Sequence, residues 1–373
     1  MRPLSIVIFL IFSTNIFSQS SQYTSKYDGT LAELYLYRQP SAKAEAMGRG
    51  MVANNNADFG SYYNPALTSL GKGINFNSSY STPYYLATES KFNYLGISYS
   101  DEKLGSFGLS RYYWTLGEEI VYTTETGQEI LTVDPDLNYS LYTLNYSREI
   151  VKDFFAGINL GLVHLHFPQP ITLANEIATP KDAFTADIGV IKRFNLESSA
   201  YKKVNQSIQL AGSVVNFTGS KITYNNNDGT SLLPIILRLG GSYNVKFKGG
   251  SIFPNSNLYE SLTHIEYQNV TNSDYNKAFM IGEEFIFSDI FILRAGFFTQ
   301  TVGLETQYNE GSQSQFTYGA GIKLPLNYIF NMKNTLSLGI DYVNMEPPTF
   351  SKSYKSWDHF NTINLNLKFI PSF

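Results

Sequence analysis

Apolar and polar residues alternate with a period of two along most of this chain. Residues 362–369 place Ile, Leu, Leu and Phe on one face of an extended strand, and Thr, Asn, Asn and Lys on the other. Fourteen such segments recur, over residues 73–81, 90–100, 103–112, 140–149, 154–165, 182–193, 206–217, 233–247, 260–269, 276–287, 290–300, 315–324, 335–343 and 360–369. The pattern predicts an all-β protein of fourteen antiparallel strands.

Residues 233–247 indicate which surroundings the two faces occupy. Their alternation sets Arg238 and Lys246 opposite a row of Ile, Leu, Tyr and Val. Burying both cations in a soluble core, or exposing the apolar row to water, would be costly. Only 16% of the residues are charged, against about a quarter in soluble proteins, yet the mean hydropathy of −0.16 is too polar for membrane helices. We therefore predict a 14-stranded transmembrane β-barrel in the cell outer membrane, with lipid outside and a wet lumen inside.

The first residues resemble a secretory signal. Arg2 is followed by an apolar run over residues 4–12 and by the small residue Ser18. We expect a signal peptide at 1–18, an N-terminal segment with a hatch at 19–72, and the barrel at 73–373. The chain has no Cys and a net charge of −4, which predicts no disulfides and argues against a nucleic-acid partner.

The stretch from Ser41 to Gly73 departs from the alternation and is rich in Ala, Gly and Asn. It contains Asn64, Pro65 and Ala66, where proline fixes its own φ, keeps Asn64 out of the helical region and can begin a short helix. An ordinary loop leading into a helix would give the same residues. The position of the stretch, between an export signal and the first strand, favours a plug inside the barrel.

The connections alternate between short turns and long loops. Short turns are typical of the periplasmic side of such barrels and long loops of the outside. We expect the loop between residues 111 and 139 to project outward and contact a partner protein, with Trp114 as the anchor. The other residues expected in this contact are Tyr112, Tyr113, Glu118 and Glu119.

Residues suited to catalysis are scarce. No Ser-His-Asp or Cys-His arrangement is present, so we predict neither an enzyme nor a bound cofactor. His164 and His166 share one face of a strand, but no third ligand lies near them in the sequence, and we predict no metal site. Glu284 and Arg294 fall on the inner faces of adjacent strands, where they are expected to form an ion pair in the lumen.

Several short motifs resemble known outer-membrane barrels. Asn64-Pro65-Ala66 matches the NPA motif in the hatch of the FadL-like barrels. Within that superfamily, the stretches 41–48, 62–67 and 110–120 are similar to the PorV/PorQ branch of the type IX secretion system. The pair 282–285 and 293–297 resembles paired strands of both families, whereas Lys43, Glu45 and Arg49 stand where smaller residues are expected. This resemblance implies a non-enzymatic barrel that binds the type IX translocon and escorts cargo proteins with C-terminal signal domains to the cell surface.

Two other functions stay open at the level of sequence. One is a FadL-like channel that passes hydrophobic small molecules through a lateral opening in the wall, and the other is a soluble exported β-sandwich adhesin. A transporter should concentrate apolar residues in its hatch and upper lumen, whereas the hatch is polar at residues 54–56. A partner-binding barrel should display its aromatic anchors, and both Trp114 and Trp357 are expected outside. The sequence therefore favours the type IX role over the channel.

Overall fold

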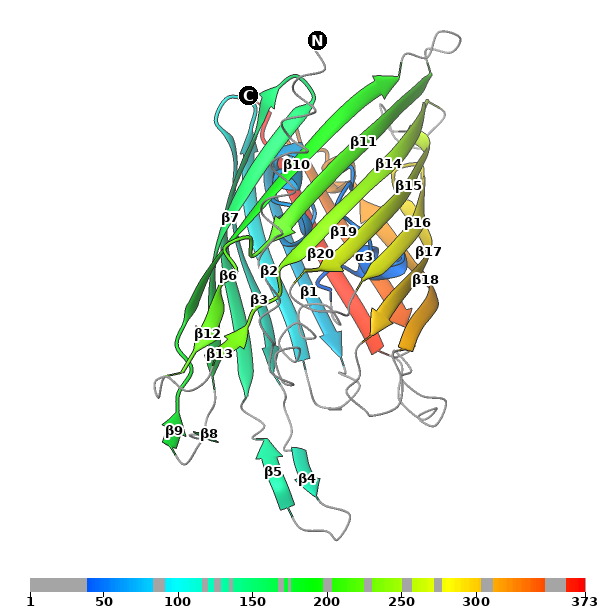
Figure 1. Cartoon of the computed structure of the whole chain (residues 1–373). Coiled ribbons are helices and arrows are strands. Elements are labelled where there is room, and N and C mark those ends of the chain that lie inside the picture. The colour runs from blue at the N-terminus through cyan, green and yellow to red at the C-terminus, as the bar shows by residue number, and fades with distance from the viewer. Residues whose placement is uncertain are drawn as a thin grey trace, which may run out of the picture.

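The computed structural model describes residues 39–82, 91–115, 120–123, 129–133, 137–166, 171–173, 176–196, 203–224, 230–249, 257–271, 277–302, 311–345 and 360–372. Its wall is one closed antiparallel barrel (Figure 1). The fourteen wall strands are β1 (Gly73–Thr82), β2 (Lys91–Asp101), β3 (Gly105–Thr115), β6 (Asn138–Val151), β7 (Phe154–His166), β10 (Ala183–Leu196), β11 (Val204–Val215), β14 (Ile236–Lys248), β15 (Asn257–Val270), β16 (Ala278–Phe287), β17 (Phe291–Val302), β18 (Gly311–Leu324), β19 (Thr335–Met345) and β20 (Phe360–Ile370). The predicted fourteen-stranded barrel is confirmed.

The barrel closes between its first and last strands. β1 pairs with β2 on one side and with β20 on the other, where Ile74 lies opposite Phe369. Lipid offers no hydrogen bonds to a strand edge, and closure supplies a backbone partner on both sides of each wall strand.

The two faces of the wall differ as the alternation predicts. On β2, Leu95 and Ile97 point outward and are 50% and 51% exposed, whereas Ser98 and Ser100 point inward and are buried. Exposed apolar side chains recur on other strands, among them Leu109, Leu144, Leu160, Phe184, Leu293 and Phe316. An apolar exterior around a polar interior is characteristic of outer-membrane β-barrels. This protein is an outer-membrane β-barrel. No helix among the described residues is both long and apolar enough to cross a membrane.

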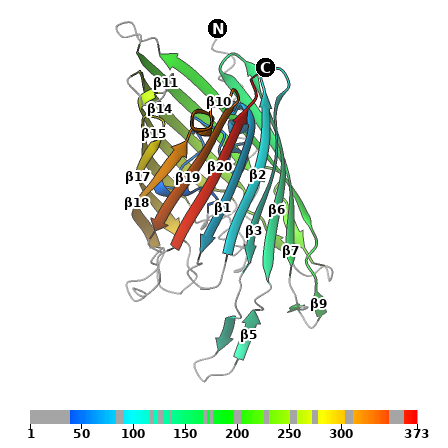
Figure 2. The same ribbon diagram turned by 180° about the vertical axis from the view of Figure 1, so that it is seen from behind.

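The two ends of the barrel differ in their connections (Figures 1 and 2). One end, here called the turn end, carries the tight connections at residues 102–104 and 152–153, and β20 finishes there. The opposite end, the loop end, carries three hairpins outside the wall sheet: β4 (Ile120–Thr123) with β5 (Glu129–Val133), β8 (Ile171–Leu173) with β9 (Glu176–Ala178), and β12 (Lys221–Thr223) with β13 (Thr230–Leu232). This asymmetry is the one that the connection lengths predict.

Residues 39–72, here called the luminal segment, lie inside the barrel. The segment contains α3 (Ala42–Ala46), α4 (Gly60–Tyr63) and the 3-10 helix η1 (Pro65–Leu70), and another short helix, α5 (Leu326–Ile329), precedes β19. α3 packs against β17, β18, β19 and β20, and η1 packs against β6, β7 and β10. The luminal segment is also hydrogen-bonded to the wall along its length. The backbone N–H groups of residues 42, 48 and 51 donate to side chains of β20, β18 and β15, in that order. The carbonyl oxygens of residues 53, 54, 61, 65 and 68 accept from side chains of β14, β11, β7, β6 and β2.

Glycines on the inner face of the wall let the luminal segment approach closely. A Cβ atom added at Gly189 would overlap the Asn64 side chain, and one added at Gly157 would overlap the Pro65 backbone. Gly282 and Gly296 leave similar room for the backbone at residues 47–48. These positions need glycine because a backbone or a buried amide occupies the space where any other side chain would begin.

Deletion of residues 360–373 should abolish assembly of the barrel. The deletion removes β20, so β19 and β1 would both present unpaired edges to lipid. We expect no heat-modifiable band from outer membranes on gel electrophoresis, while the full-length chain shows one. A folded, heat-modifiable truncated protein would contradict this prediction.

Candidate functional site

Asn64, Pro65 and Ala66 form a fixed corner of the luminal segment. The Asn64 backbone is extended, and its side-chain oxygen accepts a hydrogen bond from the Ala66 N–H at 3.0 Å, which caps η1. The Asn64 amide donates to the carbonyl oxygens of Val52 at 3.0 Å and Val190 at 3.3 Å. Pro65 provides a carbonyl acceptor for Asn145 of β6 at 3.1 Å. The motif therefore joins two parts of the luminal segment to the wall.

A network of four charged side chains lies between α3 and the wall. Glu284 accepts from Lys43 and from Arg294, each at 2.6 Å, so the expected pair of Glu284 and Arg294 has a second cation from the luminal segment. Arg294 also contacts Asp341 of β19 at 2.6 Å. These side chains are at most 7% exposed, and two positive charges balance two negative ones. Buried charges at such sites are tolerated only when they are paired.

A second charged group, around Glu266 of β15, fixes the middle of the luminal segment. One oxygen of Glu266 accepts from the backbone N–H groups of Met51 and Val52, at 2.6 and 2.8 Å. The other lies 4.0 Å from Nε of Arg238, whose guanidinium also stands over the rings of Tyr62 and Tyr63. Burial raises the pKa of Tyr62 to about 12, so its phenol stays neutral at physiological pH.

Toward the loop end, the lumen is filled by apolar and aromatic side chains. One buried cluster joins the wall residues Phe92, Tyr112, Trp114, Tyr139, Val163 and Leu165 to Phe59, Tyr63 and Leu67 of the luminal segment. The same cluster includes Ile222 and Leu233, at the hairpin formed by β12 and β13. Phe92 lies 6.1 Å from Trp114 and 6.3 Å from Tyr112 between ring centroids. The luminal segment is thus polar where it meets charged wall residues and apolar where it faces the loop end.

The expected partner-contact residues are not arranged as predicted. β3 continues to Thr115, so Trp114 is still part of the sheet and its side chain points into the lumen, 4% exposed. Tyr112 points the same way and is buried, whereas Tyr113 points outward. The expectation of a surface Trp114 is therefore wrong, because the period-two alternation runs further than the segment assigned from the sequence. Glu118, Glu119 and Trp357 lie outside the described residues.

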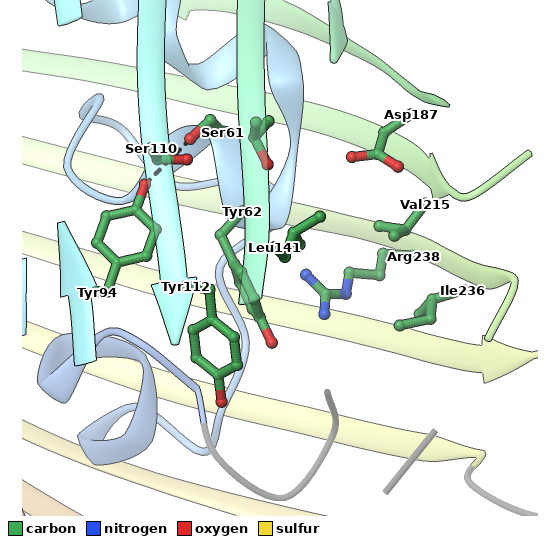
Figure 3. A pocket seen from close by; sticks show the side chains of 11 residues that line it. Ser61, Tyr62, Tyr94, Ser110, Tyr112, Leu141, Asp187, Val215, Ile236 and Arg238 are labelled. Carbon is green, nitrogen blue, oxygen red and sulfur yellow. Dashed lines mark hydrogen bonds between the residues drawn. The ribbon is translucent and has the colours of Figure 1, made fainter. Parts of the chain in front are cut away.

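A small cavity lies beside this cluster, between the luminal segment and the wall (Figure 3). Its volume is about 20 Å³, which is room for about one water. Tyr62, Tyr94 and Tyr112 lie on one side of it, and Asp187 and Arg238 on the other (Figure 3). The remaining lining residues are Ser61, Ser110, Leu141, Thr143, Val215 and Ile236. The luminal segment and the wall therefore leave little unfilled space between these side chains.

A larger groove of about 610 Å³ lies on the outer face of the same part of the wall. Its sides are mainly apolar and include Leu95, Ile97, Leu109, Leu144, Leu160 and Phe184. Ser110 and Thr143 line both this groove and the inner cavity. They belong to a row of facing small residues, Gly96, Ser110, Thr143 and Gly161, on β2, β3, β6 and β7. This row was not among the site residues predicted from the sequence, where its signal is the small size of these four residues at matching inward positions.

The histidines identified in the sequence lie on the outer face near the loop end. Nδ1 of His164 lies 2.7 Å from Asp182, and the His164 ring stacks on His166 with 6.5 Å between centroids. Within the described part of the chain, no three His, Asp or Glu side chains are grouped so that they could hold a metal ion.

Comparisons with known proteins give the following similarities. No protein-family model matches the sequence, and no curated protein matches it. Among solved structures, the chain is similar to the Pseudomonas putida toluene transporter TodX, with 12% identity, coverage of 90% of this chain and 98% of that one, and a TM-score of 0.41. It is also similar to the Ralstonia pickettii toluene transporter TbuX, with 10% identity, coverage of 90% and 98%, and a TM-score of 0.39. For LpxR from Salmonella typhimurium the identity is 12%, the coverage 80% and 100%, and the TM-score 0.34.

Arg294→Met should strongly destabilise the barrel. It leaves Glu284 and Asp341 buried without their shared cation, which typically costs about 3 kcal/mol or more. Lys72→Met removes a cation from an exposed pair with Glu102 and should cost less than about 1 kcal/mol. Urea unfolding of the refolded proteins in detergent micelles measures both values. Equal stabilities of the two variants would show that the luminal network does not support the fold.

Trp114→Ala and Tyr113→Ala test the direction in which each side chain points. Removing a buried indole should cost about 3 kcal/mol or more of unfolding free energy. Removing Tyr113, whose ring lies 4.4 Å from the Arg111 guanidinium carbon on the outer face, should cost about 1 kcal/mol or less. The same urea titration compares them. A larger loss for Tyr113→Ala would reverse the assignment of the two faces.

Proposed function

We propose that this protein is an outer-membrane channel for hydrophobic small molecules, which leave the lumen sideways through the wall between β2 and β7. The observation that carries the proposal is the apolar and aromatic lumen toward the loop end, around Trp114, Tyr112 and Phe92. A solute that enters from the loop end would exchange water for aromatic surface, which favours apolar molecules.

The contacts of the luminal segment favour an exit through the wall rather than an exit along the barrel axis. Lys43 is paired in the charged network, and Met51 and Val52 are hydrogen-bonded to Glu266. A solute that moved along the barrel axis would have to break these buried contacts. The charged groups would then be buried without partners, which is energetically costly. The wall at Ser110 and Thr143 needs a smaller change, since small side chains there separate the inner cavity from the outer groove.

Passage through this part of the wall requires a transient opening. The pairing between β3 and β6 runs without a register shift from Ser106 opposite Ser147 to Thr115 opposite Asn138. The structure is therefore a closed state, and a solute would pass when the strands separate locally near Ser110 and Thr143. An apolar solute would then enter the groove on the lipid side without crossing a layer of water.

The type IX role implied by the resemblance has less support. It depended on Trp114 as an exposed anchor for the translocon or for cargo, and that side chain is buried in the lumen. The lumen toward the loop end is instead apolar, which is what we expect of a transporter of hydrophobic molecules. The residues that would still favour a partner interface, Glu118, Glu119 and Trp357, lie outside the described part of the chain.

A disulfide between β3 and β6 tests the proposed exit. Ser110 and Thr143 face each other in the sheet, and facing residues of antiparallel strands are close enough for a disulfide. The chain has no Cys, so the double variant Ser110→Cys/Thr143→Cys contains a single pair of thiols. We expect the oxidised variant to lower uptake of radiolabelled naphthalene to the level of cells without the protein, and reduction to restore it.

The matched control is Ser106→Cys/Ser147→Cys, which links the same two strands at an equivalent facing pair nearer the turn end. This variant should transport naphthalene equally well when oxidised and reduced. If the disulfide between positions 110 and 143 leaves uptake unchanged, the lateral exit is wrong. If neither the variants nor the natural sequence raises uptake above background, the channel function itself is wrong.

A further inference from the structure

The lipid-facing wall carries an arginine, Arg111, among exposed apolar and aromatic side chains. Arg111 pairs in the sheet with Leu95 on one side and Tyr142 on the other, both of which are exposed on the outer face. Among the described residues no carboxylate lies within ion-pair distance of its guanidinium; the described polar contact is a hydrogen bond from Nη2 to Ser140 at 3.2 Å. An uncompensated cation facing a membrane is costly unless it has an anionic partner or reaches the interface.

The residues around Arg111 fix the height of its guanidinium along the barrel wall. The guanidinium carbon lies 4.4 Å from the centre of the Tyr113 ring and 5.5 Å from that of Tyr142. One residue pair nearer the loop end, Tyr113, Ser140 and His164 form a polar row on adjacent strands. Toward the turn end, the outward residue of β3 is Leu109, which is 60% exposed. Arg111 therefore marks the boundary between the apolar band and a polar, headgroup-like level.

The outer groove begins at this boundary. Arg111 is one of the residues that line it, and the others along its length are mainly apolar, including Leu109, Leu144 and Leu160. A cationic end joined to an apolar groove matches an amphiphile with an anionic head and a hydrocarbon chain. On the outside of a membrane barrel, the molecules with this chemistry that cover the surface are lipids.

We propose that Arg111 and the outer groove bind a phosphate-bearing membrane lipid, with the phosphate on the guanidinium and one acyl chain in the groove. Arginine presents five N–H donors in a planar fork that suits phosphate oxygens. Asp182, an acidic residue on this face, is hydrogen-bonded to His164 one row away. This site stands independently of whether a solute leaves through the same part of the wall.

The site has two parts that single substitutions can separate. Arg111→Gln removes the charge and keeps a polar side chain at the boundary. Leu144→Trp fills the groove from a lipid-exposed position, where a larger side chain does not disturb the lumen. Arg148→Gln is the matched control, since Arg148 is an exposed arginine on β6 near the turn end, away from the groove.

Native mass spectrometry of the detergent-purified full chain can count bound lipid at known concentrations. The probes are dimyristoyl phosphatidic acid, dimyristoylglycerol with the same chains and no phosphate, and inorganic phosphate alone. We expect phosphatidic acid to bind the natural sequence about tenfold more tightly than dimyristoylglycerol. Arg111→Gln should remove that difference, Leu144→Trp should weaken both lipids, and Arg148→Gln should change neither. Heat-modifiability confirms that each variant is folded.

Three results would overturn the proposal. Equal loss of phosphatidic acid binding in Arg111→Gln and Arg148→Gln would indicate general attraction to positive charge. Binding of inorganic phosphate as tight as that of phosphatidic acid would indicate an adventitious ion only. Unchanged binding in Leu144→Trp would show that the groove holds no acyl chain. Naphthalene uptake is measured separately with the disulfide variants, so failure of the lipid site is distinguishable from failure of the channel.

Discussion

Ion pairing inside the lumen is the interaction on which the rest of the structure depends. Lys43, Glu284, Arg294 and Asp341 are sealed between the luminal segment and the wall, with equal numbers of positive and negative charges. Without the luminal segment, Lys43 would be lost and two carboxylates would share one cation. The wall and the segment are therefore electrostatically complete only together, and an emptied barrel of this sequence would carry an uncompensated charge at its centre.

The inside of the barrel is divided around its circumference. Strands β14, β15, β16, β17 and β19 provide the charged groups that lie against α3 and the middle of the luminal segment. Strands β2, β3, β6 and β7 provide the aromatic lumen on one face and the apolar groove on the other. The charged side needs a fixed geometry, because its contacts are short and buried. On the other side, β6 and β7 hold the luminal segment by hydrogen bonds from the neutral side chains Asn145 and Asn159, and the loop end is held by packing. Moving neutral contacts costs less than separating buried charges.

The sequence predicts the wall well because lipid imposes one rule on every strand. Outward residues such as Leu95 and Leu109 must be apolar, and period-two alternation follows directly. The alternation of faces continues through residues 112–114, but all three are aromatic, so the residue types do not display it. The sequence therefore gives no sign that β3 extends to Trp114 and that this side chain points inward. A single sequence also does not show which distant residues are in contact. Lys43 is an unexpected residue in the stretch 41–48, but nothing in the sequence indicates that it pairs with Glu284. Likewise, the need for glycine at positions 157 and 189 can be recognised only in the structure, where Pro65 and Asn64 lie against them.

The path of the luminal segment has a consequence for how many strands the wall contains. Its hydrogen bonds pass around the inner face from β20 to β2, so a short stretch of chain touches most of the circumference. The diameter of a barrel grows roughly linearly with its strand number. With one hairpin more, the wall would move out of hydrogen-bond reach, and with one fewer it would collide with the segment at its glycines. The contacts of the luminal segment are thus compatible with a barrel of this circumference and not with a wider or narrower one.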